Sequence, residues 1–514
     1  MSSRIMDAPD PVTAGHTGLV VLDGIGLGVA DVVRLADGSA RAVPGTDAMK
    51  RVTESWDAAR QIAATGRVYG RSTGVGANRN EDVPTEAAAE HGLRLLRSHA
   101  GAIGAELPAR QVRAMLAIRA NQLLAGGAGL RPTVVTALCE ALESGAHPVV
   151  NEFGSVGTGD IAALAQAGLA LAGEHPWRGP DDAGVRSGVA APEPQPLDNN
   201  DALAFISSNA LTLGQAALAL HELRGLVEAT QVVGALSLLA VDGSHEAYAA
   251  PVHAARPHRG SAEVARRMRE LIGAEDRPTP PLGRIQDPYG FRCLPQIHGP
   301  AQDAADALEE VLTIEINAAA ENPLISPEDM AAYHHGGFYQ AQLALALDHF
   351  RLALTQVARL STSRLSTLNE PAFTRLRPFL ADHEPASSGV MILEYAAGAA
   401  LGDLRAFSAP ASLGHAVLSR GVEEQASFAS LAARQTLRAC GAYRLVVGCE
   451  LVAAVRALRQ RDLRPDPGLP VGRALELAEA VLAADPADRP LTGDVTAAAA
   501  LLDRFTDIWR GSEA

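Results

Sequence analysis

The chain is poor in the residues that disulfide-stabilised, metal-binding and nucleic-acid-binding proteins depend on. Only four of its 514 residues are cysteines, and they show neither CxxC nor Cys/His spacing. This excludes a disulfide framework and a structural zinc site and favours a reducing compartment. Basic residues are also scarce, since 44 Lys and Arg against 59 Asp and Glu give a net charge of −15. An acidic chain without a basic patch repels phosphate backbones, so we expect no nucleic-acid binding.

Signals for export, membrane insertion and nucleotide binding are absent as well. Residues 1–18 lack the basic and apolar regions of a signal peptide, so we expect a disordered N-terminus and a cytoplasmic protein. The most apolar stretch, 210–241, contains six Gln, His, Glu and Arg residues, too many for a lipid-facing span. It is predicted to be a long helix buried in protein. Without metal-ligand spacing or a phosphate-binding motif, neither a metal nor a nucleotide is expected.

Aromatic residues make up only 4% of the chain, and Ala and Leu dominate several long segments. Apolar residues recur there at spacings of three and four, which predicts an all-α protein with a large helical bundle and a mixed N-terminal region. β-branched alternation is confined to short pieces such as 17–22. Helices that are apolar all round need other helices to cover them, which favours an oligomer. The predicted helices are 161–172, 210–241, 301–317, 340–360, 389–407 and 423–458.

Three segments rich in Pro, Gly and charge predict breaks, at 179–200, 369–388 and 464–470. They suggest a contiguous division of the chain into four parts. A disordered start is followed by an N-terminal region, a central long-helix bundle and a helical tail. The corresponding ranges are 1–18, 19–200, 201–465 and 466–514.

Polar clusters stand out against this apolar background. The segment YGRSTGVG begins at Tyr69 and holds three glycines, which permit a mobile loop that carries the tyrosine into a pocket. The alternative is a plain turn with a packed Tyr69. A second cluster is Ser98-His99.

Two further clusters have equally local alternatives. The segment QDPYGFR ends at Arg292, and its Tyr289 lies three residues earlier, which suits a phenolic acid or base beside a carboxylate clamp. The same residues could form a structural turn. The segment NEFGSVGTGD ends at Asp160, which could simply cap the helix that follows.

In this order and spacing, the clusters resemble the aromatic amino acid ammonia-lyase family, and within it the histidine ammonia-lyase branch. The likeness extends over nearly the whole chain. The matching segments are the Tyr69 loop, Ser98-His99, Arg119-Ala120-Asn121, His147-Pro148-Val149-Val150, the segment from His253 to His258, Gln286 to Tyr289 with Arg292, Glu321-Asn322-Pro323-Leu324, and Asp488-Arg489-Pro490-Leu491.

The resemblance implies an all-α bundle of the aspartase/fumarase-like type, assembled as a homotetramer whose active sites are each built by three subunits. It further implies a 4-methylideneimidazol-5-one electrophile, made from an internal Ala-Ser-Gly, and the non-oxidative elimination of ammonia from an α-amino acid. The reaction needs such help, because the β-proton is very weakly acidic and ammonia is a poor leaving group.

The resemblance also implies roles for matched residues of this sequence. Tyr69 corresponds to the catalytic base and Arg292 to the carboxylate clamp. His99 and Glu423 would face the substrate side chain, where they could hydrogen-bond an imidazole, so the expected substrate is histidine or has another polar side chain. The remaining matched positions around the ring and substrate are Tyr289, Gln286 and Phe338.

The departures from the family pattern lie at the centre of the chemistry. Where the family reads GSVGASGD, this chain reads GSVGTGD, one residue shorter, so the candidate ring-forming residues are Gly157, Thr158 and Gly159. Dehydration of Thr158 would leave an ethylidene, whose methyl crowds the carbon that the amine attacks. In an ungapped alignment, Ser207 occupies the place of the family's ring-supporting Asn, and Asn209 follows two positions later.

Three hypotheses remain open. The protein is an ammonia-lyase, or an aminomutase with the same first half-reaction, using a ring built on Thr158. Alternatively, no ring forms, and Tyr69 and Arg292 drive β-elimination of a better leaving group from another carboxylate substrate. The third is a non-catalytic family member, which the intact Tyr69 loop disfavours.

Overall fold

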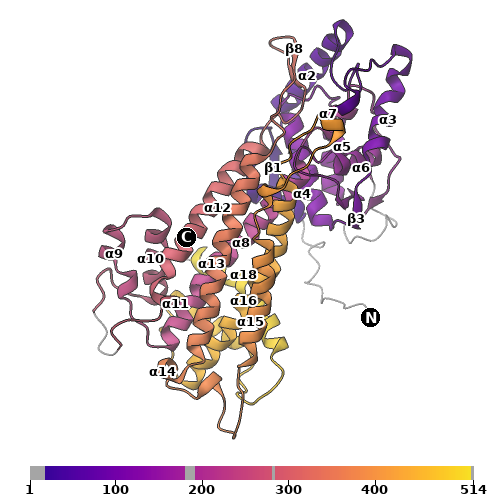
Figure 1. Cartoon of the computed structure of the whole chain (residues 1–514). Helices are drawn as coiled ribbons and strands as arrows, with labels where there is room; N and C mark the ends of the chain where they lie inside the picture. Colours follow the sequence, from indigo (N-terminus) through magenta and orange to yellow (C-terminus); the bar gives the residue numbers. More distant parts are fainter. Residues whose placement is uncertain (1–17, 180–190, 280–283, 511–514) are drawn as a thin grey trace. The chain divides into compact units, whose positions relative to one another are not determined.

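The computed structural model describes residues 18–179, 191–279 and 284–510. The predicted disordered start, apart from Gly18, lies outside these residues, as do residues 180–190 of the predicted loop 179–200. The described residues form a protein dominated by long helices, as the sequence predicts (Figure 1). The sheets among them have two strands each.

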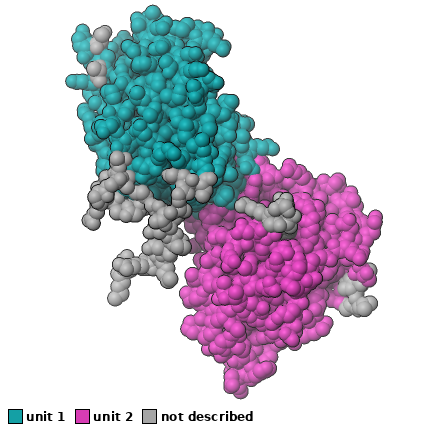
Figure 2. Space-filling model, turned by 180° about the vertical axis from the view of Figure 1, so that it is seen from behind, with its two compact units in different colours: residues 1–221, 309–347, 410–437 teal, residues 222–308, 348–409, 438–514 magenta. Residues whose placement is uncertain are grey.

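The chain divides into two compact units, and each is discontinuous in sequence (Figure 2). Unit 1 comprises residues 1–221, 309–347 and 410–437, and unit 2 comprises 222–308, 348–409 and 438–514. This differs from the contiguous division predicted from the sequence. The reason is that four unit boundaries fall inside helices. These helices are α8 (Ala210–Ala240), α12 (Leu294–Ile316), α13 (Ala341–Leu368) and α16 (Ala429–Gln460).

Unit 1 holds the predicted mixed region. Strand β1 (Gly18–Leu22) alternates buried and exposed residues and pairs in parallel with β2 (Ala40–Pro44). Helix α1 (Val29–Ala36) packs on α4 (Ala109–Leu124). Helix α4 is buried almost throughout. Helix α5 (Thr133–Ser144) is followed by Gly145, whose φ of +78° is the left-handed conformation that glycine adopts readily. The other helices and strands of unit 1 are α2 (Thr46–Thr65), α3 (Ala88–His99), β3 (Ile103–Glu106), β4 (His147–Pro148), β5 (Asn151–Phe153), α6 (Ile161–Leu171), β6 (Trp177–Arg178), α7 (Ala202–Ile206), β7 (Leu324–Ser326) and β8 (Ala331–Tyr333).

The regular secondary structure of unit 2 consists of helices, and no strand occurs among its described residues. Its core holds an ion pair between the fully buried Arg364 of α13 and Glu450 of α16, with 2.6 Å between Nε and Oε1. The hydroxyls of Ser237 on α8 and Ser361 on α13 also donate to Glu450. The shorter helices of this unit are α9 (Ala250–Ala254), α10 (Arg259–Ile272), α11 (Tyr289–Arg292), α14 (Pro371–Thr374), α15 (Ile392–Phe407), α17 (Pro470–Val481) and α18 (Thr492–Arg510).

The long apolar segment predicted to be a buried helix is α8. By length and composition, residues 202–240 could cross a membrane, but 94% of the most apolar window is buried inside the protein. The burial agrees with the prediction of a helix covered by protein, and it accounts for an apolar surface on all sides.

Candidate active site

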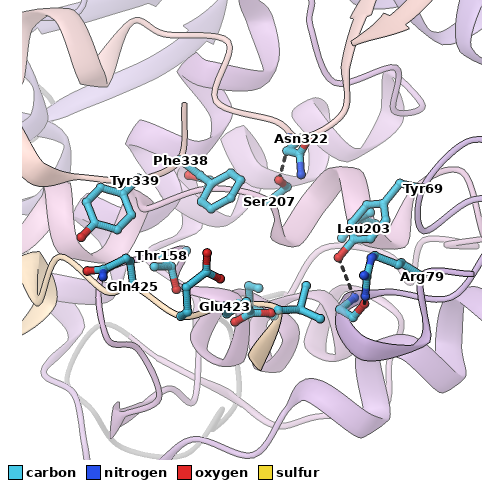
Figure 3. A pocket seen from close by; sticks show the side chains of 16 residues that line it. Tyr69, Arg79, Thr158, Leu203, Ser207, Asn322, Phe338, Tyr339, Glu423 and Gln425 are labelled. Carbon is cyan, nitrogen blue, oxygen red and sulfur yellow. Dashed lines mark hydrogen bonds between the residues drawn. The ribbon is translucent and has the colours of Figure 1, made fainter. Parts of the chain in front are cut away.

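Unit 1 contains a cavity of about 370 Å³, and five separate segments of the chain line it (Figure 3). It brings together six residues that the sequence analysis singled out for different reasons. These are Tyr69, Thr158, Gly159, Ser207, Phe338 and Glu423. Residues far apart in sequence therefore share one chemical environment, which is the usual form of a small-molecule site.

Tyr69 reaches the cavity from the glycine-rich loop. Its phenol oxygen accepts a hydrogen bond of 2.7 Å from the backbone N–H of Gly76, at the far end of the same loop. Gly70 has a φ of +69°, and a Cβ there would lie 2.0 Å from a methyl carbon of Leu203, so only glycine permits this close approach. The tight loop thus positions the Tyr69 side chain at the cavity.

The environment of Tyr69 raises the pKa of its phenol above the ordinary value. Burial is the main cause, and the negative charge of Glu423 adds to it. The Gly76 N–H and the positive charge of Arg79 act in the opposite direction, because both favour the phenolate. Tyr69 is therefore protonated at neutral pH in the free protein but has a donor in place for its ionised form.

The segment Gly157-Thr158-Gly159 is held by backbone contacts on both sides. The Ser427 hydroxyl donates to the Gly157 carbonyl at 2.7 Å, and the Gly159 N–H donates to Asn209 Oδ1 at 3.0 Å. Gly157 has a φ of +91°, and a Cβ there would lie 2.2 Å from Ser427 Oγ. The first position of this segment is therefore restricted to glycine, whereas Thr158 lines the cavity.

Asn209 and Ser207 have different partners. Besides accepting from Gly159, Asn209 donates through Nδ2 to the Phe338 carbonyl at 2.8 Å. Ser207 Oγ accepts from the Asn322 N–H at 2.9 Å. Asn209, two positions after the aligned place, is thus the residue that supports the Gly157-Thr158-Gly159 segment, while Ser207 fixes Asn322 at the cavity wall.

Two buried acids anchor the segments behind the cavity. Asp160 precedes α6, but its carboxylate does not cap that helix as the local alternative proposed. It accepts instead from the Thr212 N–H and hydroxyl at 2.7 and 2.8 Å, at the start of α8. Glu321 pairs with the fully buried Arg119 at 2.8 Å, and the Arg119 Nε donates to the Phe205 carbonyl. The bonds of Asp160 hold the start of α8 close to Asn209, and the Arg119–Glu321 pair holds the residue next to Asn322.

The cavity is lined by charged side chains of both signs. Arg79 is the single cationic residue among its lining residues, and Glu423 and Glu424 are the acidic ones. The Glu423 carboxylate makes no hydrogen bond or ion pair with other described residues, so it is available to a ligand. In the view of Figure 3, Arg79 lies beside Tyr69 on one side, Tyr339 lies on the other side, and Phe338 and Glu423 lie between them.

Besides Gly157 and Asn209, four residues that the resemblance placed at the site do not line this cavity. His99 ends α3, and its Nδ1 faces the Leu95 carbonyl of its own helix at 2.8 Å. The other three belong to unit 2: Gln286 is exposed, Tyr289 is 67% exposed, and the Arg292 guanidinium lies 4.4 Å from the Tyr289 ring centroid. A tyrosine and arginine three apart thus contact each other as predicted, but outside this cavity.

The sequence analysis assigned no role to several other residues that line the cavity. Asn322 belongs to a segment that matches the family and Tyr339 comes directly after the matched Phe338, whereas Arg79, Glu424 and Gln425 gave no signal of their own. The one available clue was nearness in sequence to a matched position, because Arg79 lies three residues after the Tyr69 loop and Glu424 and Gln425 come directly after Glu423.

Comparison with known proteins gives consistent matches. A family model described as "Aromatic amino acid lyase" matches residues 27–481. The histidine ammonia-lyase of Geobacillus thermodenitrificans is 32% identical over 494 residues, which cover 94% of this chain and 97% of that protein.

Solved structures agree with this match. The histidine ammonia-lyase of Trypanosoma cruzi superposes with a TM-score of 0.87 at 26% identity, covering 97% of this chain and 95% of that one. Ergothionase from Treponema denticola, an ergothioneine-degrading enzyme, gives 0.86 at 26% identity, with coverages of 95% and 99%. The tyrosine aminomutase of Streptomyces globisporus gives 0.87 at 25% identity, with coverages of 96% and 98%.

Proposed function

Because this chain belongs to the aromatic amino acid lyase family, we propose that it is a carbon–nitrogen lyase that eliminates ammonia from an α-amino acid with a histidine-like side chain. The observation that carries the proposal is the cavity itself, in which the Tyr69 phenol, Thr158 and the free Glu423 carboxylate converge. Relatives that are histidine ammonia-lyases support the choice of side chain. An aminomutase that retains and re-adds the amine shares the same first step and the same residues.

In the proposed reaction, the Tyr69 oxygen takes the β-proton of the substrate. The electron pair of that C–H bond forms the double bond between Cα and Cβ, and the amine leaves Cα with its bonding pair. The Gly76 N–H, 2.7 Å from the phenol oxygen, stabilises the phenolate that acts as base. Glu423 would accept a hydrogen bond from a protonated or N–H-bearing side chain.

The carboxylate clamp and the assembly belong to the same proposal. Gln286, Tyr289 and Arg292 do not line the cavity of their own chain, and Tyr289 is 67% exposed. We propose that they complete the cavity of another copy, in a homotetramer with shared sites. The four cysteines are free thiols, three of them buried, which supports a location in the reducing cytoplasm.

The family implies a methylideneimidazolone ring, and the residues present do not fit it. A terminal methylidene comes from a serine Cβ, whereas Thr158 carries a methyl group on that carbon. Gly157 is also confined, because a Cβ at this position would lie 2.2 Å from Ser427 Oγ, so the family's alanine has no room. No step of the proposed reaction therefore passes through the ring.

This misfit favours a second candidate function, a ring-free β-elimination that expels a leaving group other than ammonia. The similarity to ergothionase, an enzyme described as degrading ergothioneine, supports a family member that acts on something other than a common amino acid. Both candidates use Tyr69 as the base, and they differ in the leaving group. The mass of the peptide that contains Thr158 tests the misfit: a deficit of two waters would show a cyclised variant ring and remove the ground for the second candidate, whereas an unmodified mass would support it.

The proposed base is tested by Tyr69→Phe, which removes the hydroxyl and keeps the ring. We expect at least about a hundredfold loss of kcat for amine release, the usual scale for a general base. Tyr333→Phe is the control, because Tyr333 lies on β8 of the same unit and does not line the cavity. Full turnover by the Tyr69 variant would refute the proposed mechanism.

A further inference from the structure

The Tyr69 loop contacts a distant segment of the chain through Ser419. The Ser419 hydroxyl accepts a hydrogen bond of 3.0 Å from the backbone N–H of Ala77. The preceding N–H, that of Gly76, donates to the Tyr69 oxygen at 2.7 Å. Two successive N–H groups of the short turn Gly76–Asn78 therefore have different acceptors, the proposed base and Ser419. Because the peptide group that joins them is planar, a contact that fixes the Ala77 N–H also restrains Gly76.

Gly76 and Ser419 are packed closely against each other. Gly76 has a φ of +54°, and a Cβ there would lie 2.6 Å from Ser419 Oγ. A side chain has no room at this distance, so the contact requires glycine. The Glu423 carboxylate is also near, because its Oε1 would lie 3.5 Å from the same Cβ. Ser419 thus lies where the loop that carries the base meets the loop that carries Glu423.

Ser419 is held in an unfavourable backbone conformation. Its φ is +51°, and Arg420 follows with a φ of +57°. Residues with a Cβ seldom adopt this left-handed region, because the Cβ crowds the following carbonyl oxygen. A backbone bridge closes the segment, in which the Leu418 N–H donates to the Glu423 carbonyl at 2.8 Å. The bend directs the Ser419 hydroxyl at Ala77, and strain of this kind is found where a defined arrangement depends on it.

We propose that Ser419 is a positioning residue for the base, which holds the Gly76 N–H on the Tyr69 oxygen and links this donor to the loop of Glu423. The inference rests on the proposed role of Tyr69 as base. Ser419 does not line the cavity, so it acts through Gly76 and not on the substrate. The bond from the Gly76 N–H lowers the pKa of the Tyr69 phenol, because it stabilises the phenolate. Loss of the Ser419 hydroxyl frees the turn, and the Tyr69 pKa rises.

A substitution at Ser419 leaves the charged and titratable groups around the Tyr69 ring in the sequence. They are Glu423, Arg79 and His334, whose ring meets the Tyr69 ring edge-on with 6.3 Å between the centroids. His334 Nε2 also accepts from the Tyr69 N–H at 3.4 Å. Glu423 shares a loop with Ser419, so its contribution requires a control of its own.

The first experiment titrates Tyr69 in the full-length protein by the ultraviolet absorbance of tyrosinate. Each protein is compared with its own Tyr69→Phe version, and the difference isolates Tyr69 from the other tyrosines. Ser419→Ala removes the hydroxyl, and Ser419→Gly does so without backbone strain, which keeps the test valid if alanine prevents folding. We expect both variants to raise the titration midpoint of Tyr69 by about 0.5 pH or more, the scale of one hydrogen bond.

The matched control is Ser326→Ala, which removes a hydroxyl that donates to Asp329 at 2.7 Å, outside the cavity. It should leave the Tyr69 midpoint unchanged. In a Glu423→Gln background, Ser419→Ala should still raise the midpoint by the same amount. A shift that disappears in this background would mean that Ser419 acts through the carboxylate, and the inference would be wrong.

Kinetics give a second readout, which a purely structural role would not produce. In Ser419→Ala, kcat for amine release should fall about threefold to tenfold at neutral pH, with KM within about twofold, and recover at alkaline pH. Tyr69→Phe should not recover at any pH. A Ser419→Ala enzyme that stays equally slow at alkaline pH would overturn the inference.

The outcomes separate this inference from the proposed function. An unshifted Tyr69 midpoint in both Ser419 variants, together with an inactive Tyr69→Phe, would overturn the inference and leave the lyase proposal standing. Full activity of Tyr69→Phe would overturn both.

Discussion

Tyr69 is the residue on which the proposed chemistry depends, and its neighbours set its acidity. Two effects raise its pKa, burial first and the Glu423 charge second, and two lower it, the Gly76 N–H and the Arg79 charge. The proposed base acts when deprotonated, so the rate of elimination should rise with pH on the alkaline side. The pH at which the rate rises should follow the Tyr69 pKa, so it should shift when the charge of a neighbouring residue is removed.

The pH dependence of kcat/KM therefore distinguishes the two charges. Glu423→Gln removes a charge that raises the Tyr69 pKa, so the alkaline limb should move to lower pH. Arg79→Gln removes a charge that lowers it, so the limb should move to higher pH. Glu424→Gln is the control, since Glu424 lines the same cavity but is not among the groups that shift the Tyr69 pKa. Shifts of the same sign in both test variants would contradict Tyr69 as the titrating base.

Gly157 offers a second test at this scale. Restoring the family's alanine with Gly157→Ala introduces a Cβ beside Ser427 Oγ at a φ of +91°. We expect a loss of about 1–3 kcal/mol of stability, measured by thermal or denaturant unfolding. Gly441→Ala is the control, because a Cβ there meets nothing within 4 Å and helix propensity favours the change. An unchanged unfolding midpoint for Gly157→Ala would show that the segment is free to move.

The sequence indicated some of these residues but not their arrangement. Tyr69 and Thr158 were recognisable because glycine-rich segments interrupt a helical pattern. The contacts of Asn209 with Gly159 and Phe338 were not recognisable, because they join residues 50 and 129 positions apart. Such contacts depend on tertiary packing, and the local periodicity of apolar residues does not predict which distant residues meet.

At the scale of elements, helix interiors were more predictable than helix ends. The predicted helix 210–241 corresponds closely to α8, but the predicted start at 423 is wrong, since α16 begins at Ala429. Phe428 has a φ of +54°, and its N–H bonds to the Val156 carbonyl. A tertiary contact therefore overrides the periodic pattern there. Helix α12 begins at Leu294, ahead of the predicted 301, because it continues through Pro300.

The helices of unit 2 are joined by the buried Glu450, and this predicts a large effect of a single change. Glu450→Ala leaves the Arg364 guanidinium uncompensated in a site with 0% side-chain exposure. We expect a loss of about 3–5 kcal/mol in stability, measured by denaturant unfolding.

The control for this prediction is a surface pair in the same unit. Glu270→Ala breaks an exposed pair with Arg266 on α10, whose side chains are 45% and 50% exposed. It should cost less than about 1 kcal/mol. Equal effects of the two substitutions would mean that the buried network contributes no more than a surface contact.

At the scale of the whole molecule, the proposed shared sites predict complementation between inactive variants. Tyr69→Phe damages the cavity of unit 1, and Arg292→Ala removes the proposed clamp from unit 2 of another copy. Each variant alone should lack activity, but co-expression should restore part of it, because a mixed tetramer contains some sites with both residues intact. Sedimentation analysis gives the oligomeric state independently. Monomeric protein, or mixtures without any recovery, would contradict shared sites.

Unit 1 is built from three separate stretches of sequence, and this limits how the gene can be recombined with the genes of relatives. The cavity-lining residues extend from Tyr69 to Gln425 and are carried on stretches separated by residues 222–308 and 348–409. A single crossover between codons 69 and 425 divides them between two parents and mixes two specificities in one pocket. Exchange of the block 348–409 as a cassette leaves every cavity-lining codon and the proposed clamp at Arg292 from one parent, whereas exchange of 222–308 replaces the clamp. Chimaeras built from the 348–409 cassette would therefore inherit substrate preference and the stability of the exchanged helices as separate traits.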